Sequence, residues 1–240
     1  MNPSAAVRSE LASTGRLRVG INYGNFLLVT KGQNGEYTGI AVDLGRELGR
    51  RLGVPIDLVA FATAGKLADA VKAGAWDVAF LGNEPQRAGD IAFSPAYLEI
   101  EATYLVPAGS KIRSIADVDR EGVRIATAVN SAYDLYLSRT LKHATLVRAN
   151  AIQGSYDVFV KDKLEVLSGL RPRLVTDTET LPGSRVLDGR FTVVQQSVGT
   201  PQGRPAAAGY LSEFAKEIKT SGFVAQAIAR HAVRGVTVAA

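Results

Sequence analysis

Short apolar strands alternate with amphipathic helices along the first third of the chain, and this alternation constrains the fold more than any other feature. Apolar residues recur at every fourth position in Ile40, Leu44, Leu48 and Leu52, and Gly53 follows. That spacing predicts an amphipathic helix that ends at the glycine. The segment predicts strands at 17–21, 56–60 and 77–81 and helices at 40–52 and 66–73, with a hairpin turn at Asn34-Gly35. Strand, helix, strand, helix, strand indicates right-handed crossovers and a mostly parallel sheet.

Two long extended runs, at 100–106 and 191–198, separate this part from a second set of alternating elements. The second set predicts strands at 123–127, 146–147 and 164–167 and helices at 131–141 and 156–161. The chain closes with predicted helices at 206–220 and 223–232. Two α/β segments joined by two extended runs predict two lobes with two crossing strands. We expect lobe 1 to contain residues 1–105 and 197–240, and lobe 2 residues 106–196.

Composition fits a globular protein and excludes several chemistries. The chain has 240 residues, of which 46% are hydrophobic and 21% charged, enough for two lobes. It has no cysteine, which excludes disulfides, thiolate zinc sites and a cysteine nucleophile. With only two histidines, well separated in sequence, we expect no metal site, and we expect no cofactor.

The net charge of +5 is small and scattered along the chain. Its densest cluster is Arg46, Arg50 and Arg51, which we interpret as a solvated helix face. No basic stripe interleaved with aromatic residues is present, so nucleic-acid binding is disfavoured.

No apolar run reaches the ~18 residues needed to span a bilayer. The first residues lack the features of a secretory signal, so either a signal was removed or the protein is cytoplasmic.

Polar and aromatic residues follow the predicted strands, where ligands bind in α/β lobes. Arg87 comes soon after a buried strand that ends in Gly82, and a guanidinium is a planar, bidentate clamp for a carboxylate. The alternative is an ordinary surface arginine. Asn22, Tyr23, Phe26 and Phe61 also follow strand ends, and these aromatic rings could hold an apolar ligand body. For Phe61 a place in the core is almost as good an interpretation.

Ser131 lies between a predicted strand and a predicted helix, and Ser131-x-x-Asp134 matches a capping box. Free N–H groups and the positive dipole end of a helix suit an anion. The alternative is a simple helix cap, and Asp134 would compete for the same donors. No nucleophile elbow, phosphate-loop or dinucleotide motif is present, and Glu84 and Glu165 are the only carboxylates that we single out as a general acid or base.

Four segments in this order and spacing resemble the family 3 extracellular solute-binding proteins, the amino-acid-type receptors of ABC transporters. The segments lie at 17–20, 37–44 and 75–79 and at Arg87 with the aromatic-Ser-Pro-x-Tyr run of 93–97. The resemblance covers 17–233. It implies an α/β, two-lobed type II periplasmic-binding-protein fold, each lobe a mostly parallel sheet flanked by helices. It also implies hinge closure at two strands, near 105–106 and 195–196.

The resemblance also implies roles for residues in the predicted loops. Arg87 matches the arginine that clamps the ligand α-carboxylate, and Asn130 with Ser131 match the helix start that completes the clamp. Asn22 matches a position that often contacts the ligand amino group, and Gly82 with Asn83 match the loop at the same end of the ligand. The predicted ligand-binding set is Arg87, Asn130, Ser131, Asn22, Tyr23, Phe26, Phe61, Gly82, Asn83 and Glu84, with no catalytic residue.

Two departures from the family pattern bear on the ligand. The turn between Asp77 and Arg87 is about two residues shorter than usual and lacks the common threonine. Amino-acid receptors also place an aspartate for the ligand ammonium in lobe 2, where the corresponding stretch, 165–170, is apolar at that position. Either Glu84 or Glu165 substitutes, or the ligand is a carboxylate without an α-ammonium, since an unpaired buried ammonium costs several kcal/mol. We favour the second possibility.

The sequence therefore predicts a non-catalytic, monomeric, periplasmic binding component of an ABC importer whose signal peptide has been removed. It would capture a small carboxylate or amino acid between two closing lobes and deliver it to a membrane permease. One alternative is a cyclohexadienyl dehydratase-like enzyme acting on prephenate or arogenate, with Glu84 or Glu165 as the acid. The other is a sensory receptor domain.

Overall fold

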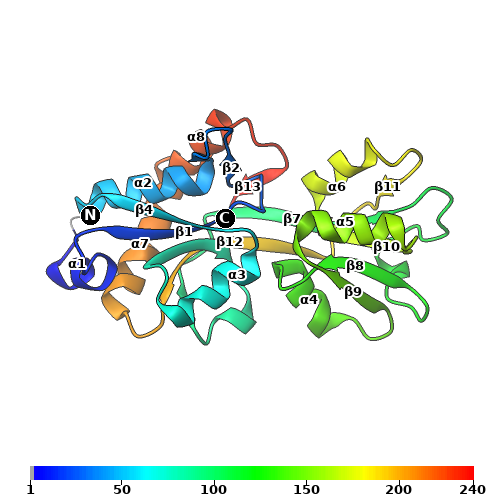
Figure 1. Cartoon of the computed structure of the whole chain (residues 1–240), viewed down its shortest axis with the longest axis horizontal. Helices are drawn as coiled ribbons and strands as arrows, with labels where there is room; N and C mark the ends of the chain where they lie inside the picture. The colour runs from blue at the N-terminus through cyan, green and yellow to red at the C-terminus, as the bar shows by residue number, and fades with distance from the viewer. Residues whose placement is uncertain (1–2) are drawn as a thin grey trace. The chain divides into compact units, whose positions relative to one another are not determined.

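The protein consists of two compact units, shown in a computed structural model that describes residues 3–240 (Figure 1). Unit 1 contains the chain up to Glu99 and again from Gln195 to Ala240, and unit 2 contains Ile100–Val194. The chain passes between the units within two strands, β7 (Leu98–Val106) and β12 (Thr192–Pro201).

Unit 1 is built from a parallel sheet with one antiparallel neighbour. Its elements are α1 (Ala5–Leu11), β1 (Leu17–Asn22), β2 (Thr30–Lys31), β3 (Tyr37–Thr38), α2 (Ile40–Leu52), β4 (Ile56–Phe61), α3 (Ala64–Asp69), η1 (Ala70–Ala73), β5 (Val78–Gly82), η2 (Pro85–Arg87), β6 (Ile91–Phe93), α7 (Pro205–Thr220), α8 (Phe223–Arg230) and β13 (Val236–Val238). The strand order is β4-β1-β5-β12, and β6 pairs with β12. β1 is parallel to β4 and β5, whereas β5 and β12 are antiparallel. The predicted mostly parallel sheet is confirmed.

Helices α2 and α3 cover opposite faces of this sheet because successive side chains of β1 point to opposite sides. On one face, a Cβ added at Gly45 of α2 would lie 2.9 Å from a methyl group of Val19. On the other, a Cβ at Gly20 would lie 2.7 Å from a methyl group of Leu67. The indole Nε1 of the fully buried Trp76 donates to the Leu67 carbonyl at 2.9 Å, which fixes α3 against the strands.

Unit 2 repeats the strand–helix alternation. Its elements are η3 (Ile115–Asp117), β8 (Arg124–Ala128), α4 (Ala132–Thr140), β9 (Thr145–Ala149), α5 (Ala151–Lys161), β10 (Val166–Leu170), α6 (Arg171–Thr178) and β11 (Arg185–Val186). The strand order is β7-β10-β8-β9, with β11 beside β7. β8 is parallel to β9 and β10, and β10 is antiparallel to β7.

The core of unit 2 has two layers, one on each face of its sheet. Ile125 and Val166 pack with Leu137 of α4 on one face. The next residue of each strand, Ala126 and Leu167, packs on the other face, in a cluster that also contains Phe159 of α5 and Leu174 of α6. A strand buried on both faces therefore accounts for the continuous apolar runs in the sequence.

Several predicted boundaries in unit 2 were wrong. Helix α5 begins at Ala151 rather than 156, and β10 spans Val166–Leu170 rather than 164–167. Helix α6 was not predicted, and it carries Pro172 in its first turn. In the first turn of a helix, however, proline loses no intrahelical hydrogen bond. In unit 1, the helix predicted at 66–73 is α3 followed by the 3₁₀ turn η1, and it ends at Gly74 as predicted.

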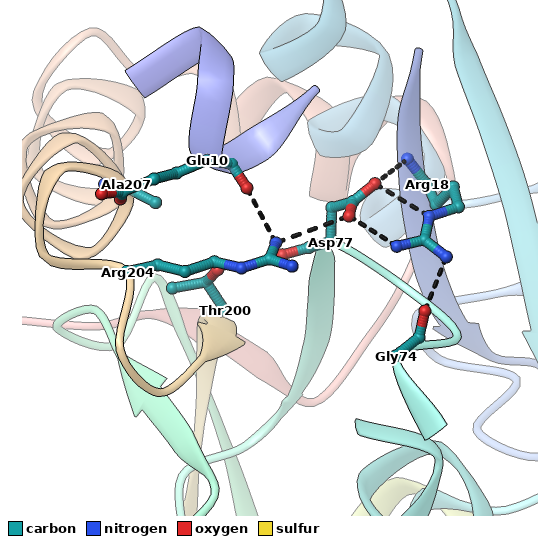
Figure 2. Close-up of polar contacts among 7 residues, drawn as sticks. All are labelled: Glu10, Arg18, Gly74, Asp77, Thr200, Arg204 and Ala207. Atoms are coloured by element: carbon teal, nitrogen blue, oxygen red, sulfur yellow. Dashed lines mark hydrogen bonds and ion pairs between the residues drawn. The ribbon is translucent and has the colours of Figure 1, made fainter. Parts of the chain in front are cut away.

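A buried carboxylate ties the amino ends of the unit 1 strands to two helices (Figure 2). Asp77 accepts hydrogen bonds from the backbone N–H of Arg18 at 3.0 Å and from its Nε and Nη2 at 3.1 and 2.7 Å. Nη1 of Arg204 lies 3.4 Å from the same carboxylate and donates to the Glu10 carbonyl at 2.8 Å. The Thr200 hydroxyl donates to the Asp77 carbonyl. The side chain of Asp77 thus links the start of β5 to β1 and to the segment before α7, and its backbone carbonyl adds a bond to β12.

The described helices can also be compared with the dimensions of a bilayer. None of those within residues 3–240 combines the length and the apolar character that a membrane crossing requires.

Candidate functional site

The carboxyl edge of the unit 1 sheet collects most of the residues that the sequence analysis singled out. Asn22, Phe61 and Gly82 are the last residues of β1, β4 and β5. Asn22 stands opposite Phe61 in the parallel register of β1 and β4. Because parallel strands end at one edge, their following loops lie next to one another there.

The loop after β1 is held in place by its own polar groups. The Asn22 side-chain oxygen accepts the Gly24 N–H at 3.0 Å, and the Tyr23 N–H donates to the Phe61 carbonyl at 3.0 Å. A Cβ added at Gly24 would lie only 2.1 Å from the Ala62 carbonyl oxygen, so only glycine allows the two loops to approach this closely. Asn22 therefore shapes the loop, because its oxygen is used within the chain.

The three aromatic residues of this edge have different surroundings. Tyr23 and Phe26 are exposed, and the Tyr23 ring lies 5.8 Å from that of Tyr37. Phe61 is partly buried and packs against the cluster around Trp76 on the α3 face. Exposed rings at a strand edge suit an apolar ligand body, whereas the packing of Phe61 favours its interpretation as a core residue.

Arg87 ends a compact turn that begins at Gly82. The Asn83 N–H donates to the Gln195 carbonyl of β12 at 2.8 Å, which anchors the turn to the sheet. The Arg87 N–H donates to the Glu84 carbonyl at 2.9 Å, and guanidinium Nη1 donates to the Gly82 carbonyl at 2.7 Å. Gly82, Asn83, Glu84 and Arg87 are thus brought together in one rigid structure.

The guanidinium of Arg87 is a buried positive charge, since the residue is only 6% exposed. Burial lowers its pKa to about 10, and the charges of Glu84 and Asp69 oppose that change. The group therefore stays protonated at neutral pH. Glu84 is itself buried at the start of the turn. A cation held in this way can bind an anion strongly, because its donors are desolvated and fixed in direction.

In unit 2, Asn130 and Ser131 stand at the start of α4, as predicted, but the Asn130 N–H and the Ser131 hydroxyl both form hydrogen bonds within the chain. Asn130 has a positive φ of 56°, a conformation that asparagine tolerates. Its N–H donates to the Asp134 carboxylate at 2.8 Å, and the Ser131 hydroxyl accepts the Asp134 N–H at 3.1 Å. The Ser131 hydroxyl therefore caps the helix as a capping box requires. The N–H that donates to the Asp134 carboxylate, however, is that of Asn130 rather than that of Ser131.

Asp134 is the internal competitor that the sequence indicated. Its carboxylate is buried and also accepts Nε of Arg148 at 3.0 Å. Within residues 3–240, the N–H groups of Ala132 and Tyr133 have no acceptor among the hydrogen bonds of this helix start. They occupy the first two helical positions, where such donors are normally orphaned. Free N–H groups were expected from the sequence at this helix start, but the two residues that carry them were not named there.

The carboxyl end of β10 carries apolar and basic residues rather than a carboxylate. Leu170 ends the strand and is buried. Arg171 follows and pairs with Glu101 at 2.6 Å, and Arg173 pairs with Asp177 at 2.8 Å. Glu165 precedes β10 at the opposite edge, where it pairs with Arg124 of β8 at 2.8 Å.

Several solved structures share this fold. The solute receptor for L-cysteine of Neisseria gonorrhoeae superposes with a TM-score of 0.80 at 16% identity, covering 97% of this chain and 96% of that one. A binding component of an ABC transporter from Wolinella succinogenes, solved with lysine, gives 0.76 at 22% identity, covering 90% and 95%. An ancestral amino-acid-binding protein, described as a precursor of cyclohexadienyl dehydratase, gives 0.77 at 22% identity, covering 95% and 99%.

Two α/β units with these strand-edge loops define a binding protein of the type II periplasmic fold, and this prediction is confirmed. The chain belongs to the bacterial extracellular solute-binding proteins, family 3, whose sequence model matches residues 17–233. No curated protein sequence matches the chain.

Proposed function

We propose that this protein is the solute-binding component of an ABC importer and captures a small carboxylate. The observation that carries the proposal is Arg87, a buried, protonated guanidinium fixed in the turn that follows β5. A buried guanidinium at the ligand-binding edge of an α/β sheet is suited to a carboxylate. Family membership supports solute binding at an extracellular or periplasmic location. A membrane permease is the proposed partner.

We further propose that the ligand lacks an α-ammonium group. An ammonium taken out of water needs a carboxylate partner, and without one it costs several kcal/mol. The carboxyl end of β10 offers Leu170, Arg171 and Arg173, and these arginines are already paired with acidic residues. The two glutamates that could substitute are placed elsewhere: Glu165 stands at the opposite edge of the sheet, and Glu84 lies in the same turn as Arg87. Neither stands at the carboxyl end of β10.

A thermal-shift screen of small acids is expected to identify the ligand class. At a concentration ~100 times the Kd, a bound ligand stabilises a protein by about 2.7 kcal/mol. For a protein of this size that corresponds to a rise in Tm of about 5–10 °C. We expect this rise with 2-oxo acids, 2-hydroxy acids or dicarboxylates. A rise with α-amino acids alone would contradict the proposed ligand class, and no rise with any carboxylate would contradict the proposed function.

The helix start of unit 2 can be tested by the substitution Ala132→Pro. Proline has no N–H, so the variant removes one of the orphan donors of α4. The first helical position tolerates proline, and Ser131 has the extended backbone (φ −69°, ψ 161°) that a residue before proline prefers. We expect at least about tenfold weaker binding of the acid found in the screen, with Tm of the free protein little changed.

The matched control for that substitution is Ala5→Pro, at the first helical position of α1, where the preceding N-cap Ser4 is also extended (φ −70°, ψ 167°); it leaves the amides of α4 in place. Calorimetric titration of both variants measures the Kd. Equal affinity of Ala132→Pro and wild type would show that the Ala132 amide contributes nothing to the ligand.

A dehydratase of prephenate or arogenate is the second candidate function, and buried Glu84 beside Arg87 is the observation that favours it. A carboxyl in that position could act as a general acid. The family and the similar structures are mostly binding proteins, which favours the non-enzymatic proposal. Formation of phenylpyruvate from prephenate by the purified protein, lost in Glu84→Gln, would favour the enzyme.

A further inference from the structure

Three arginines from two distant segments surround a surface hollow on unit 1. Arg46 and Arg50 lie one turn apart on α2, and Arg230 ends α8, which packs against α2 (Figure 1). Together with Asp43, Glu47 and Phe223 they line a hollow of ≈ 230 Å³. The side chains of Arg46, Arg50 and Arg230 are 58%, 71% and 56% exposed. The sequence analysis interpreted the arginines of α2 as a solvated helix face, but it could not show that Arg230 joins them.

The inner sides of these guanidinium groups are held by two carboxylates that are each only 12% exposed. Arg50 donates Nε and Nη2 to the two oxygens of Glu47, both at 2.8 Å. Arg230 donates Nη1 to Asp43 at 2.7 Å, and Arg46 lies 4.0 Å from the same carboxylate. Hydrogen bonds from Arg50 and Arg51 hold the pKa of Glu47 near 2 against the effect of its burial. Glu47 thus stays ionised at neutral pH, and both carboxylates orient the arginines.

The balance of charge around the hollow is positive. Three arginines face two carboxylates, and the outward sides of the guanidinium groups remain in solvent. Arg51 has a different role, because it pairs with Glu217 of α7 at 2.6 Å and its guanidinium lies over the Phe214 ring. The ring of Phe223 adds an apolar wall beside the charges. Oriented guanidinium groups bind carboxylates bidentately and lose little entropy when they do so.

We propose that this hollow docks an acidic protein segment that inserts a carboxylate side chain between the arginines and places an apolar neighbour against Phe223. A carboxylate side chain that enters the hollow can meet the outward sides of the arginines, and charge complementarity of this kind favours an acidic partner. None of the residues that line the hollow belongs to the predicted ligand-binding set, so the two can be tested independently. The natural partner would be a protein with an exposed acidic loop.

A dye-labelled peptide that alternates leucine and glutamate provides the probe. Fluorescence anisotropy at low salt is expected to show saturable binding to the full chain, weakened at about 0.15 M salt. The double variant Arg46→Gln/Arg50→Gln is expected to bind the peptide at least about tenfold more weakly. Glu47 keeps Arg51 as a partner in this variant, so the fold should persist, which thermal unfolding checks.

The control Lys111→Gln/Arg113→Gln removes the same charge from exposed residues of unit 2 and is expected to leave peptide binding unchanged. Equal weakening by both double variants would overturn the proposal, because the binding would then reflect net charge alone. Vesicles of phosphatidylglycerol serve as the second probe. Binding to these vesicles without binding to the peptide would assign the surface to a membrane and would also overturn the proposal.

Discussion

Replacing Arg87 with alanine is expected to weaken binding of the carboxylate ligand at least about 100-fold, or about 2.7 kcal/mol. The variant removes a charged, desolvated donor that no other arginine of the β5 turn can replace. It also removes the hydrogen bond to the Gly82 carbonyl and the positive charge beside Glu84 and Asp69, so Tm of the free protein should fall. Binding is therefore measured by calorimetric titration well below that lowered Tm.

Two further variants separate the clamp from general effects on the fold. Arg87→Lys keeps a charge but loses the planar fork, and we expect it to bind the ligand more weakly than wild type and more tightly than Arg87→Ala. Arg16→Ala removes an exposed arginine that pairs with Asp57, and it should bind normally. If Arg87→Ala and Arg87→Lys both bind as tightly as wild type, the assignment of Arg87 as the clamp is wrong.

The pH dependence of binding provides an independent check on the same residue. Burial lowers the pKa of Arg87 to about 10 from the 12.5 of a free arginine. Because the binding form is the protonated one, affinity should be constant from about pH 6 to about pH 9 and should fall as the pH rises through about 10. Loss of affinity between pH 6 and 8 would indicate that another group controls binding.

The fold could be predicted from sequence where the apolar period was long and its ends were marked by glycine. Helix α2 begins and ends as predicted because four apolar residues and Gly53, with φ of 70°, agree. Helix α6 was missed because it has only eight residues and too short an apolar pattern to indicate a helix. It is held in place by Leu174, which packs against Gly169 of β10. Such a contact depends on tertiary structure, and the local pattern does not contain it.

The candidate site was predictable to the level of loops but not of individual donors. Strand ends meet at one edge in any parallel sheet, which is why Asn22, Phe61 and Gly82 could be grouped in advance. The sequence could not show that the side-chain oxygen of Asn22 and the backbone N–H of Asn130 form hydrogen bonds within the chain, since those bonds depend on loop geometry. The roles of the predicted ligand-binding residues remain predictions. The hollow between α2 and α8 could not be predicted, because Arg230 is far in sequence from Arg46 and Arg50.

Replacing Asp77 with alanine is expected to destabilise unit 1 more than any other single change in its polar network. Asp77 is 7% exposed and neutralises Arg18 and Arg204 at the amino ends of β1 and β5 (Figure 2). Removing one partner of a buried pair typically costs about 3–5 kcal/mol, because it leaves the other charge uncompensated. Arg18 and Arg204 are 37% and 27% exposed and can recover some hydration, so we expect about 3 kcal/mol. For a protein of this size, Tm should fall by about 6–12 °C.

The magnitude depends on burial, and a matched pair of variants tests that dependence. Asp77→Asn keeps the shape and one acceptor oxygen, so its Tm should lie between those of Asp77→Ala and wild type. Asp57→Ala breaks the bidentate contact with Arg16, whose distances of 2.5 and 2.7 Å are as short as those to Asp77, but both side chains are about half exposed. Solvent screening should make that change small. Equal loss of Tm in Asp57→Ala and Asp77→Ala would show that contact geometry, rather than burial, determines the strength of these ion pairs.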